Sequence, residues 1–234
     1  MPNTPQGFAN RLQQLRAELG EQARRVEAIC ERAFETVFSR APDQSHAIEL
    51  ADDEIDRVDV AVERAAVALL SDATHEGARL EPTELRGVLT VVKCNNELER
   101  IADCAVEIAE QARAIATESA ALPDTFRVMT NSVLGILRDI GRSFERADPA
   151  LAKVVLQSED CVLAFKAAIL RDAERRIASG EMHVEFALVL HEIANECCKI
   201  ADHCTNIAEQ IIYQATGAIV RHTDAGWVEV QRRA

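Results

Sequence analysis

The chain has 234 residues, of which 48% are hydrophobic, and a formal net charge of −13. The hydrophobic content is typical of a folded protein rather than a disordered one, and the acidic excess argues against nucleic-acid binding through phosphates. With only 9 Gly, 6 Pro and 4% aromatic residues, the composition favours long packed helices.

Apolar residues recur at helical spacing in six segments, and no segment shows a strand pattern. The predicted helices span residues 8–39, 44–70, 82–117, 125–146, 150–178 and 183–216. Pro42 and Pro149 separate the first two helices of each half, because proline is not tolerated inside a helix. Along the third helix the apolar steps alternate between three and four, which is typical of a helix-bundle seam.

An eleven-residue block occurs twice, in the third and in the sixth predicted helix. Residues 101–111 read IADCAVEIAEQ and residues 200–210 read IADHCTNIAEQ, with seven identical positions at an offset of 99. This offset is domain-sized and longer than a solenoid repeat. Because short connections favour antiparallel neighbours, the sequence predicts an all-α fold of two tandem, similar three-helix bundles. The bundles comprise residues 1–120 and 121–217, and a loose tail follows in 218–234.

The motifs that would indicate an enzyme are missing from the sequence. It contains no Gly-rich phosphate loop, no nucleophile elbow and no HExxH pair, and it lacks the ExxH motif of an oxygen-activating di-iron bundle. The seven cysteines show neither disulfide nor zinc spacing. Neither a signal peptide nor an apolar run of 18 residues is present. We therefore expect a cytoplasmic, non-enzymatic protein with reduced cysteines and no membrane insertion.

Two acidic pairs are spaced so that both carboxylates of a pair project from one helix face. Asp52 and Asp56 form one pair, and Glu99 and Asp103 form the other, each with a spacing of one helical turn. Packed side by side, the two helices would gather four like charges, which repel unless a cation binds. Carboxylate oxygens suit magnesium, manganese or iron. The alternative is an ordinary solvated acidic face, which is common on helices.

The second half keeps only part of this pattern. Asp160 and Asp202 remain as candidate ligands, whereas Ala164 and Cys198 occupy two positions that carry carboxylates in the first half. Two carboxylates with the Cys198 thiol would suit a softer ion such as zinc. We therefore expect the second site to be weaker than the first.

Several of these motifs resemble the PhoU family of phosphate-uptake regulators. They are residues 99–103 (ERIAD, beside the family's ERIGD), 202–209 (DHCTNIAE), 52–56 (DDEID), 82–86 (PTELR) and 217–222 (GAIVRH). The resemblance covers nearly the whole chain, in register in both halves. It departs from the family pattern at Ala164 and Cys198, where the second half lacks carboxylates.

The resemblance implies two similar three-helix bundles, surface metal clusters on the acidic motifs, and a homodimer. The implied metal is iron, zinc, manganese or magnesium. It further implies a cytosolic adaptor between the ATPase of a phosphate ABC transporter and a sensor histidine kinase, acting as a negative regulator of phosphate uptake and of the phosphate-starvation response. Two alternatives are a metal-binding helical module without a phosphate-regulatory role and a purely structural dimerisation bundle.

Overall fold

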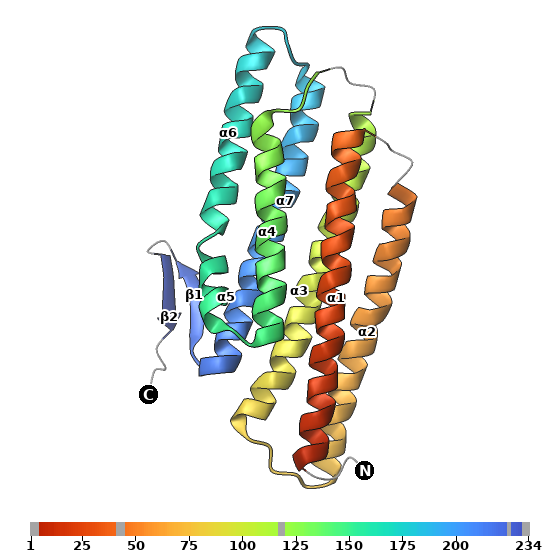
Figure 1. Cartoon of the computed structure of the whole chain (residues 1–234), viewed down its shortest axis with the longest axis vertical. Helices are drawn as coiled ribbons and strands as arrows, with labels where there is room; N and C mark the ends of the chain where they lie inside the picture. The colour runs from red at the N-terminus through yellow and green to blue at the C-terminus, as the bar shows by residue number, and fades with distance from the viewer. Residues whose placement is uncertain (1–4, 41–44, 117–119, 224–225, 231–234) are drawn as a thin grey trace.

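A computed structural model describes residues 5–40, 45–116, 120–223 and 226–230. Its elements are α1 (Pro5–Ser39), α2 (Ser45–His75), α3 (Pro82–Ala114), α4 (Asp124–Arg146), α5 (Pro149–Leu156), α6 (Glu159–Ala178), α7 (Val184–Thr216), β1 (Ile219–Thr223) and β2 (Gly226–Val230). The helices lie side by side in an elongated bundle, with α1, α2 and α3 on one side and α4 to α7 on the other (Figure 1). The predicted helical plan with two related halves is therefore confirmed.

Local sequence signals fix several helix ends. α3 begins at Pro82, and the Glu84 carboxylate accepts a hydrogen bond of 2.8 Å from the backbone N–H of Glu81, as in a capping box. The Asp148 carboxylate accepts from the N–H of Ala150 at 2.9 Å and so caps α5. These short-range contacts place the helix starts close to their predicted positions.

The fifth predicted helix is interrupted, which the sequence analysis did not anticipate. Instead of one helix over 150–178, α5 ends at Leu156 and α6 starts at Glu159. Between them, the N–H of Ser158 bonds to the carbonyl of Val155 at 3.0 Å, a tighter turn than the α-helical one. Neither Gly nor Pro marks this break. α5 and α6 each pack against α7, so tertiary packing sets the interruption.

The C-terminal segment forms a β-hairpin, so the expectation of a chain without strands was wrong there. β1 pairs antiparallel with β2, from Ile219 opposite Val230 to Thr223 opposite Gly226. Gly217 adopts a left-handed conformation (φ 75°) and ends α7, and β1 then packs back against that helix. A two-stranded hairpin needs such a partner because it is marginal alone.

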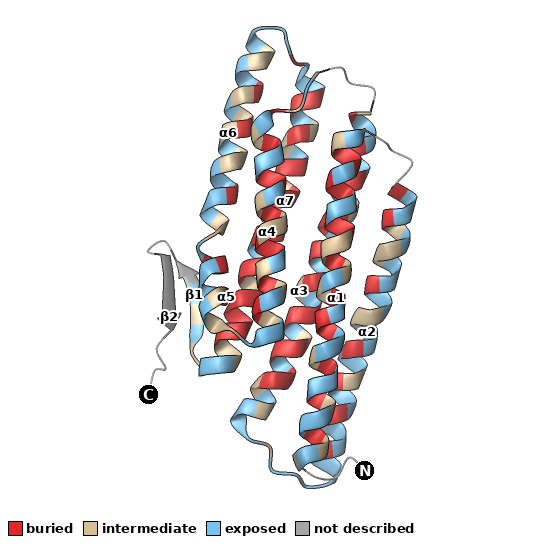
Figure 2. Ribbon diagram, viewed as in Figure 1, coloured by how far each residue is buried: buried red, intermediate tan, exposed pale blue. Residues whose placement is uncertain are grey.

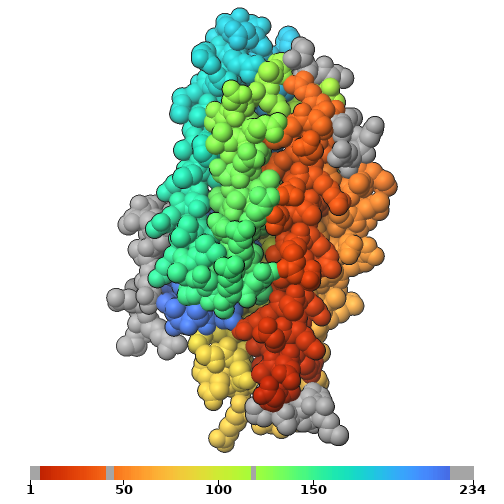
Figure 3. Space-filling view, viewed as in Figure 1, coloured from red at the N-terminus to blue at the C-terminus, as the bar shows by residue number. Residues whose placement is uncertain are grey.

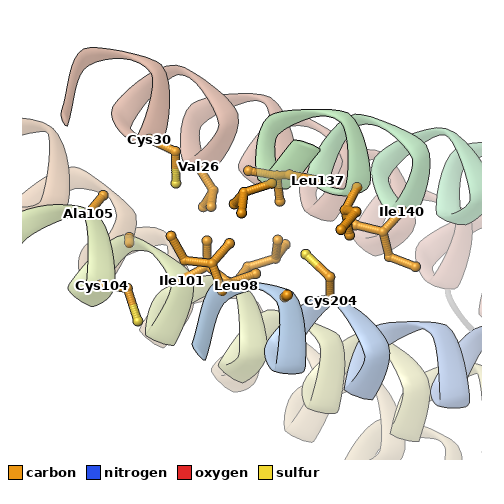
Figure 4. Close-up of a cluster of buried hydrophobic side chains, with 14 of the residues drawn as sticks. Val26, Cys30, Leu98, Ile101, Cys104, Ala105, Leu137, Ile140 and Cys204 are labelled. Atoms are coloured by element: carbon orange, nitrogen blue, oxygen red, sulfur yellow. The ribbon is translucent and has the colours of Figure 1, made fainter. Parts of the chain in front are cut away.

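One continuous apolar core runs through both halves (Figure 2). α3 packs along α7, and α1 packs along α4. Ile101 and Ile200, which match in the repeated block, are both fully buried. Val26, Ile101 and Leu137 approach one another from α1, α3 and α4 (Figure 4). The repeated block therefore supplies the contact between the halves.

No helix within the described ranges is both long enough and apolar enough to cross a membrane.

Candidate functional site

The two acidic pairs of the first half face each other where α2 packs against α3. Asp52 and Asp56 lie on α2, and Glu99 and Asp103 lie on α3. The charge of Asp103 acts on Asp52, and the charge of Asp56 acts on both Glu99 and Asp103. The tertiary structure thus brings together the four carboxylates that the sequence singled out. We call them, with Asp59 below, the acidic cluster.

The acidic cluster is under electrostatic stress. Burial, followed by the negative charges of Asp56 and Asp103, raises the pKa of Asp52 to about 6. Burial and neighbouring carboxylates also raise the pKa values of Glu99 and Asp103, against the opposing charge of Arg100. One carboxylate oxygen of Asp52, Oδ1, is buried and finds no hydrogen-bond partner among the described residues. Such a group is costly unless a donor or cation approaches it.

Asp59 is a fifth member of the cluster that the sequence reasoning missed. Its charge acts on Glu99. Asn95 of α3 donates to the Asp59 carboxylate at 2.6 Å and to its backbone oxygen at 3.0 Å. Burial and then the charge of Glu63 raise the pKa of Asp59. The available signal was its spacing of seven residues from Asp52, which keeps both on one stripe of α2.

The acidic cluster has the donor chemistry of a hard-cation site. Carboxylate oxygens are the ligands that such ions prefer, and a cation would offset the repulsion described above. The side chains as they stand do not form a coordination shell, because no group of three or more His, Cys, Asp or Glu residues in the described segments is arranged to hold a metal ion. Asp56 and Asp103 are exposed, so both can change rotamer to approach a shared ion.

The matching region of the second half has a different character. Asp160 and Asp202 are exposed, and the carboxylate whose charge reaches Cys198 is that of Glu159. Burial raises the pKa of the Cys198 thiol, Lys166 opposes this rise and Glu159 adds to it. Because metal binds the thiolate, a raised pKa disfavours Cys198 as a ligand. Lys166 adds a positive charge that further disfavours a cation.

A polar contact between α3 and α7 was also missed from the sequence. His203 Nδ1 lies 2.7 Å from Glu97 Oε2, and Asn206 donates to the same oxygen at 3.2 Å. The side chains of His203 and Glu97 are only 14% and 20% exposed. Burial works to raise the pKa of Glu97, but the bonds from His203 and Asn206 hold it below its usual value. His203 is thereby engaged in the helix contact.

The same contact is duplicated with other chemistry. Glu196 stands 99 residues after Glu97, and it lies against Cys104 of α3, whose counterpart in α7 is His203. Burial, followed by the charge of Glu196 and its hydrogen bond, raises the pKa of the Cys104 thiol to about 12. Lys199 donates to Glu196 at 2.7 Å. The α3–α7 contact therefore follows an approximate two-fold arrangement, as at a symmetric interface.

Sequence comparison matches both halves to one family. The PhoU domain matches residues 19–112 and 126–211. The phosphate-specific transport system accessory protein PhoU homolog 1 of Thermotoga maritima is 27% identical over 214 residues, covering 90% of this chain and 89% of its own. A PhoU homolog of Aquifex aeolicus is 27% identical over 212 residues, covering 90% of this chain and 94% of its own.

Solved structures agree at the level of the fold. The phosphate transport system regulatory protein PhoU from Streptococcus pneumoniae superposes with a TM-score of 0.83 at 20% identity, covering 92% of this chain and 99% of that one. PhoU from Pseudomonas aeruginosa gives a TM-score of 0.80 at 23% identity, covering 90% and 99%. The arrangement of six helical positions in two related halves is thus shared with both proteins.

Proposed function

Because the chain belongs to the PhoU family, we propose that it is an accessory and regulatory protein of phosphate transport rather than an enzyme. The observation that carries this proposal is the match of the PhoU domain to both halves, 19–112 and 126–211. The relatives from Thermotoga maritima and Aquifex aeolicus bear the name of phosphate-specific transport accessory proteins and align along almost their whole length.

In finer terms, the proposed role is that of a cytoplasmic, homodimeric adaptor. It links the ATPase of a phosphate ABC transporter with a sensor histidine kinase and restrains phosphate uptake and the starvation response when phosphate is plentiful. A continuous core across both halves supports a rigid body with two related partner faces. The net charge of −13 suits basic surfaces on those partners, because complementary charge speeds association.

Deletion of the gene tests this proposal. Phosphate-starvation transcription is expected to become active in phosphate-rich medium and to be silenced again by the wild-type chain. Affinity capture with the wild-type chain is expected to recover the transporter ATPase and the kinase, and sedimentation is expected to give a dimer. Unchanged starvation transcription in the deletion strain would contradict the regulatory role.

A metal-binding role is the second candidate, and the acidic cluster favours it. The raised pKa of Asp52 and its unpartnered Oδ1 indicate a place where a cation would relieve repulsion. The ligands would be Asp52, Asp56, Glu99 and Asp103, and the ion a hard one such as magnesium, manganese or iron. A weaker second site would use Asp160, Asp202 and Cys198, with zinc as the softer alternative.

Elemental analysis of purified protein separates these roles. The double variant Asp52→Asn with Asp103→Asn is expected to lose bound metal, and Asp160→Asn with Asp202→Asn is the matched control with an equal change in charge. If the first variant loses metal yet still silences starvation transcription, the acidic cluster binds metal without serving the regulation. Equal metal content in all three proteins would refute a site at the cluster.

A further inference from the structure

A pocket of about 450 Å³ lies where the C-terminal end of α4 meets α1. The two helices run side by side on the face seen in Figure 3. Arg16 and Ala17 of α1, Phe144 and Ala147 at the end of α4, and Gln214 of α7 contribute to its wall. This volume lies within the range of roughly 300–1,000 Å³ that small-molecule sites occupy. It is remote in the sequence from the acidic cluster of α2 and α3.

Arg16 is a partly buried cation without a counterion. Its Nε is buried and donates to no acceptor in the described parts of the chain, and no carboxylate there forms an ion pair with it. Burial alone acts on this guanidinium and lowers its pKa. A buried donor left unpaired costs free energy, and more so when it is charged. An acceptor that entered the pocket would relieve this cost.

The neighbouring α3 helix holds the guanidinium in place. If Gly87 carried a Cβ, that atom would lie only 3.0 Å from Arg16 Nη2 and 2.9 Å from Leu12 Cδ2. The absent side chain therefore leaves the space that the Arg16 head group fills against the backbone of α3. This close approach fixes one end of the guanidinium, so its position does not depend on an anionic partner.

Arg11 on the same helix shows what an ordinary arginine does here. Like Arg16, it is partly buried, but its Nη1 lies 2.6 Å from the Asp72 carboxylate. α1 therefore carries two arginines of similar exposure, of which one is paired and the other faces a pocket. This contrast separates Arg16 from a generic charged residue on a helix surface.

The other charges around the pocket leave a net demand for an anion. Arg24 is paired with both Glu21 and Glu145, so these three groups largely neutralise one another. Arg146 is exposed at the end of α4 and Glu18 is exposed on α1. The unpaired groups that line the pocket thus include two cations, Arg16 and Arg146, against one carboxylate.

We propose that this pocket binds a small oxyanion, with the Arg16 guanidinium as its principal ligand. A phosphate or a carboxylate group accepts two parallel hydrogen bonds from a guanidinium, and the Nε–H is one of the donors. Gln214 supplies a further polar group, and Phe144 with Ala17 offers an apolar wall for a small organic body. The site stands independently of the proposed role in phosphate transport.

Titration of the full-length protein with sodium phosphate and, separately, with sodium citrate tests the proposal, with sodium chloride at matched ionic strength as the reference. Binding is followed by calorimetry and by the Nε–H resonance of Arg16 in ¹H–¹⁵N spectra. A saturable shift of that resonance with phosphate alone identifies a phosphate-group ligand, and with citrate alone a carboxylate ligand. No saturable binding of either anion up to 10 mM, taken as roughly the weakest affinity of interest, would overturn the site.

Three variants locate the binding. Arg16→Gln is expected to weaken the affinity by about 10- to 100-fold, as expected for the loss of charged hydrogen bonds. Arg16→Lys keeps the charge without the planar fork and is expected to fall in between. Arg11→Gln, the matched control on the same helix, is expected to bind as the wild type does. An affinity unchanged in Arg16→Gln would refute Arg16 as the ligand, and circular dichroism verifies that each variant is folded.

Discussion

The two halves of the molecule share a core but differ at the surface where a metal site would lie. In the first half, α2 and α3 gather Asp52, Asp56, Glu99 and Asp103, whose charges act on one another. In the second half, the corresponding face of α6 and α7 presents a partly buried thiol, Cys198, with Lys166 and Glu159 nearby. Apolar contacts were therefore retained across the duplication while the polar surface was free to change.

The difference shows which contacts hold the halves together. Ile101 and Ile200 are both buried between the bundles, and replacing either would leave a cavity. Surface carboxylates carry no such constraint, because water solvates them wherever they stand. Retained like charges on one face, despite their mutual repulsion, therefore indicate a use for them in the first half that the second half does not require.

The largest expected effect tests the equivalence of the two cores. Ile101→Ala and Ile200→Ala should each lower the free energy of unfolding by about 2–5 kcal/mol, because each deletes fully buried methyl groups. Urea denaturation followed by circular dichroism measures both. Leu188→Ala, at a side chain that is 59% exposed, should change stability by less than about 0.5 kcal/mol. A large loss for only one of the two isoleucines would break the equivalence.

The next effect sharpens the difference between the surfaces. Manganese at a hundred times its dissociation constant should stabilise the wild type by about 2.7 kcal/mol, because it binds the folded state. The gain should persist in Asp202→Asn and disappear in the Asp52→Asn, Asp103→Asn double variant. Denaturation with and without the ion, after treatment with chelator, measures it. A gain lost only in Asp202→Asn would place the stronger site in the second half.

Without metal, the acidic cluster should make stability depend on pH. The folded pKa of Asp52, raised to about 6, exceeds its unfolded value, so the protonated form stabilises the fold. That contribution is complete below about pH 4 and is lost as the pH rises through 6. In chelator, Asp52→Asn should therefore exceed the wild type by about 1–2 kcal/mol at pH 8, allowing for solvent screening.

This advantage should shrink to nothing near pH 4. Denaturation curves at several pH values measure it, with Asp160→Asn as the exposed control from the second half. An advantage of Asp52→Asn that stays constant from pH 4 to pH 8 would show that the carboxylate charge is not its cause.

The smallest expected effect concerns the duplicated α3–α7 contact. Glu97→Gln should cost about 1–2 kcal/mol, because it removes a charge that is hydrogen-bonded to the largely buried His203 and Asn206. Glu196→Gln should cost less than about 1 kcal/mol, because its partner Lys199 is 59% exposed and an exposed pair contributes little. Equal costs would show that the two versions of the contact are energetically alike.

Much of the helical architecture was predictable because its signals are local. Pro149 and Asp148 mark the start of α5, and Gly217 marks the end of α7. The break at Gln157 and Ser158 was not predictable, since no Gly or Pro stands there. For the hairpin, the run from Ile219 to Thr223 is rich in β-branched residues, but its partner strand and the end of α7 stabilise it from a distance.

The candidate site was predictable in part. Spacing along a helix identified Asp52 with Asp56 and Glu99 with Asp103, since residues four apart share a helix face. Spacing said nothing of Asp59 reaching Glu99, nor of Glu159, rather than Asp160, acting on Cys198. Those relations depend on how two helices are rotated against each other.

The sequence by itself determined the helices, the duplication and the family, because periodicity, proline breaks and repeated motifs are written in neighbouring residues. Only the tertiary structure decided which charges meet. It joined Glu97 to His203 across α3 and α7, and it left Arg16 without a carboxylate while pairing Arg11 with Asp72. Such pairings arise from distances between helices that are far apart in the chain, and apolar packing sets those distances.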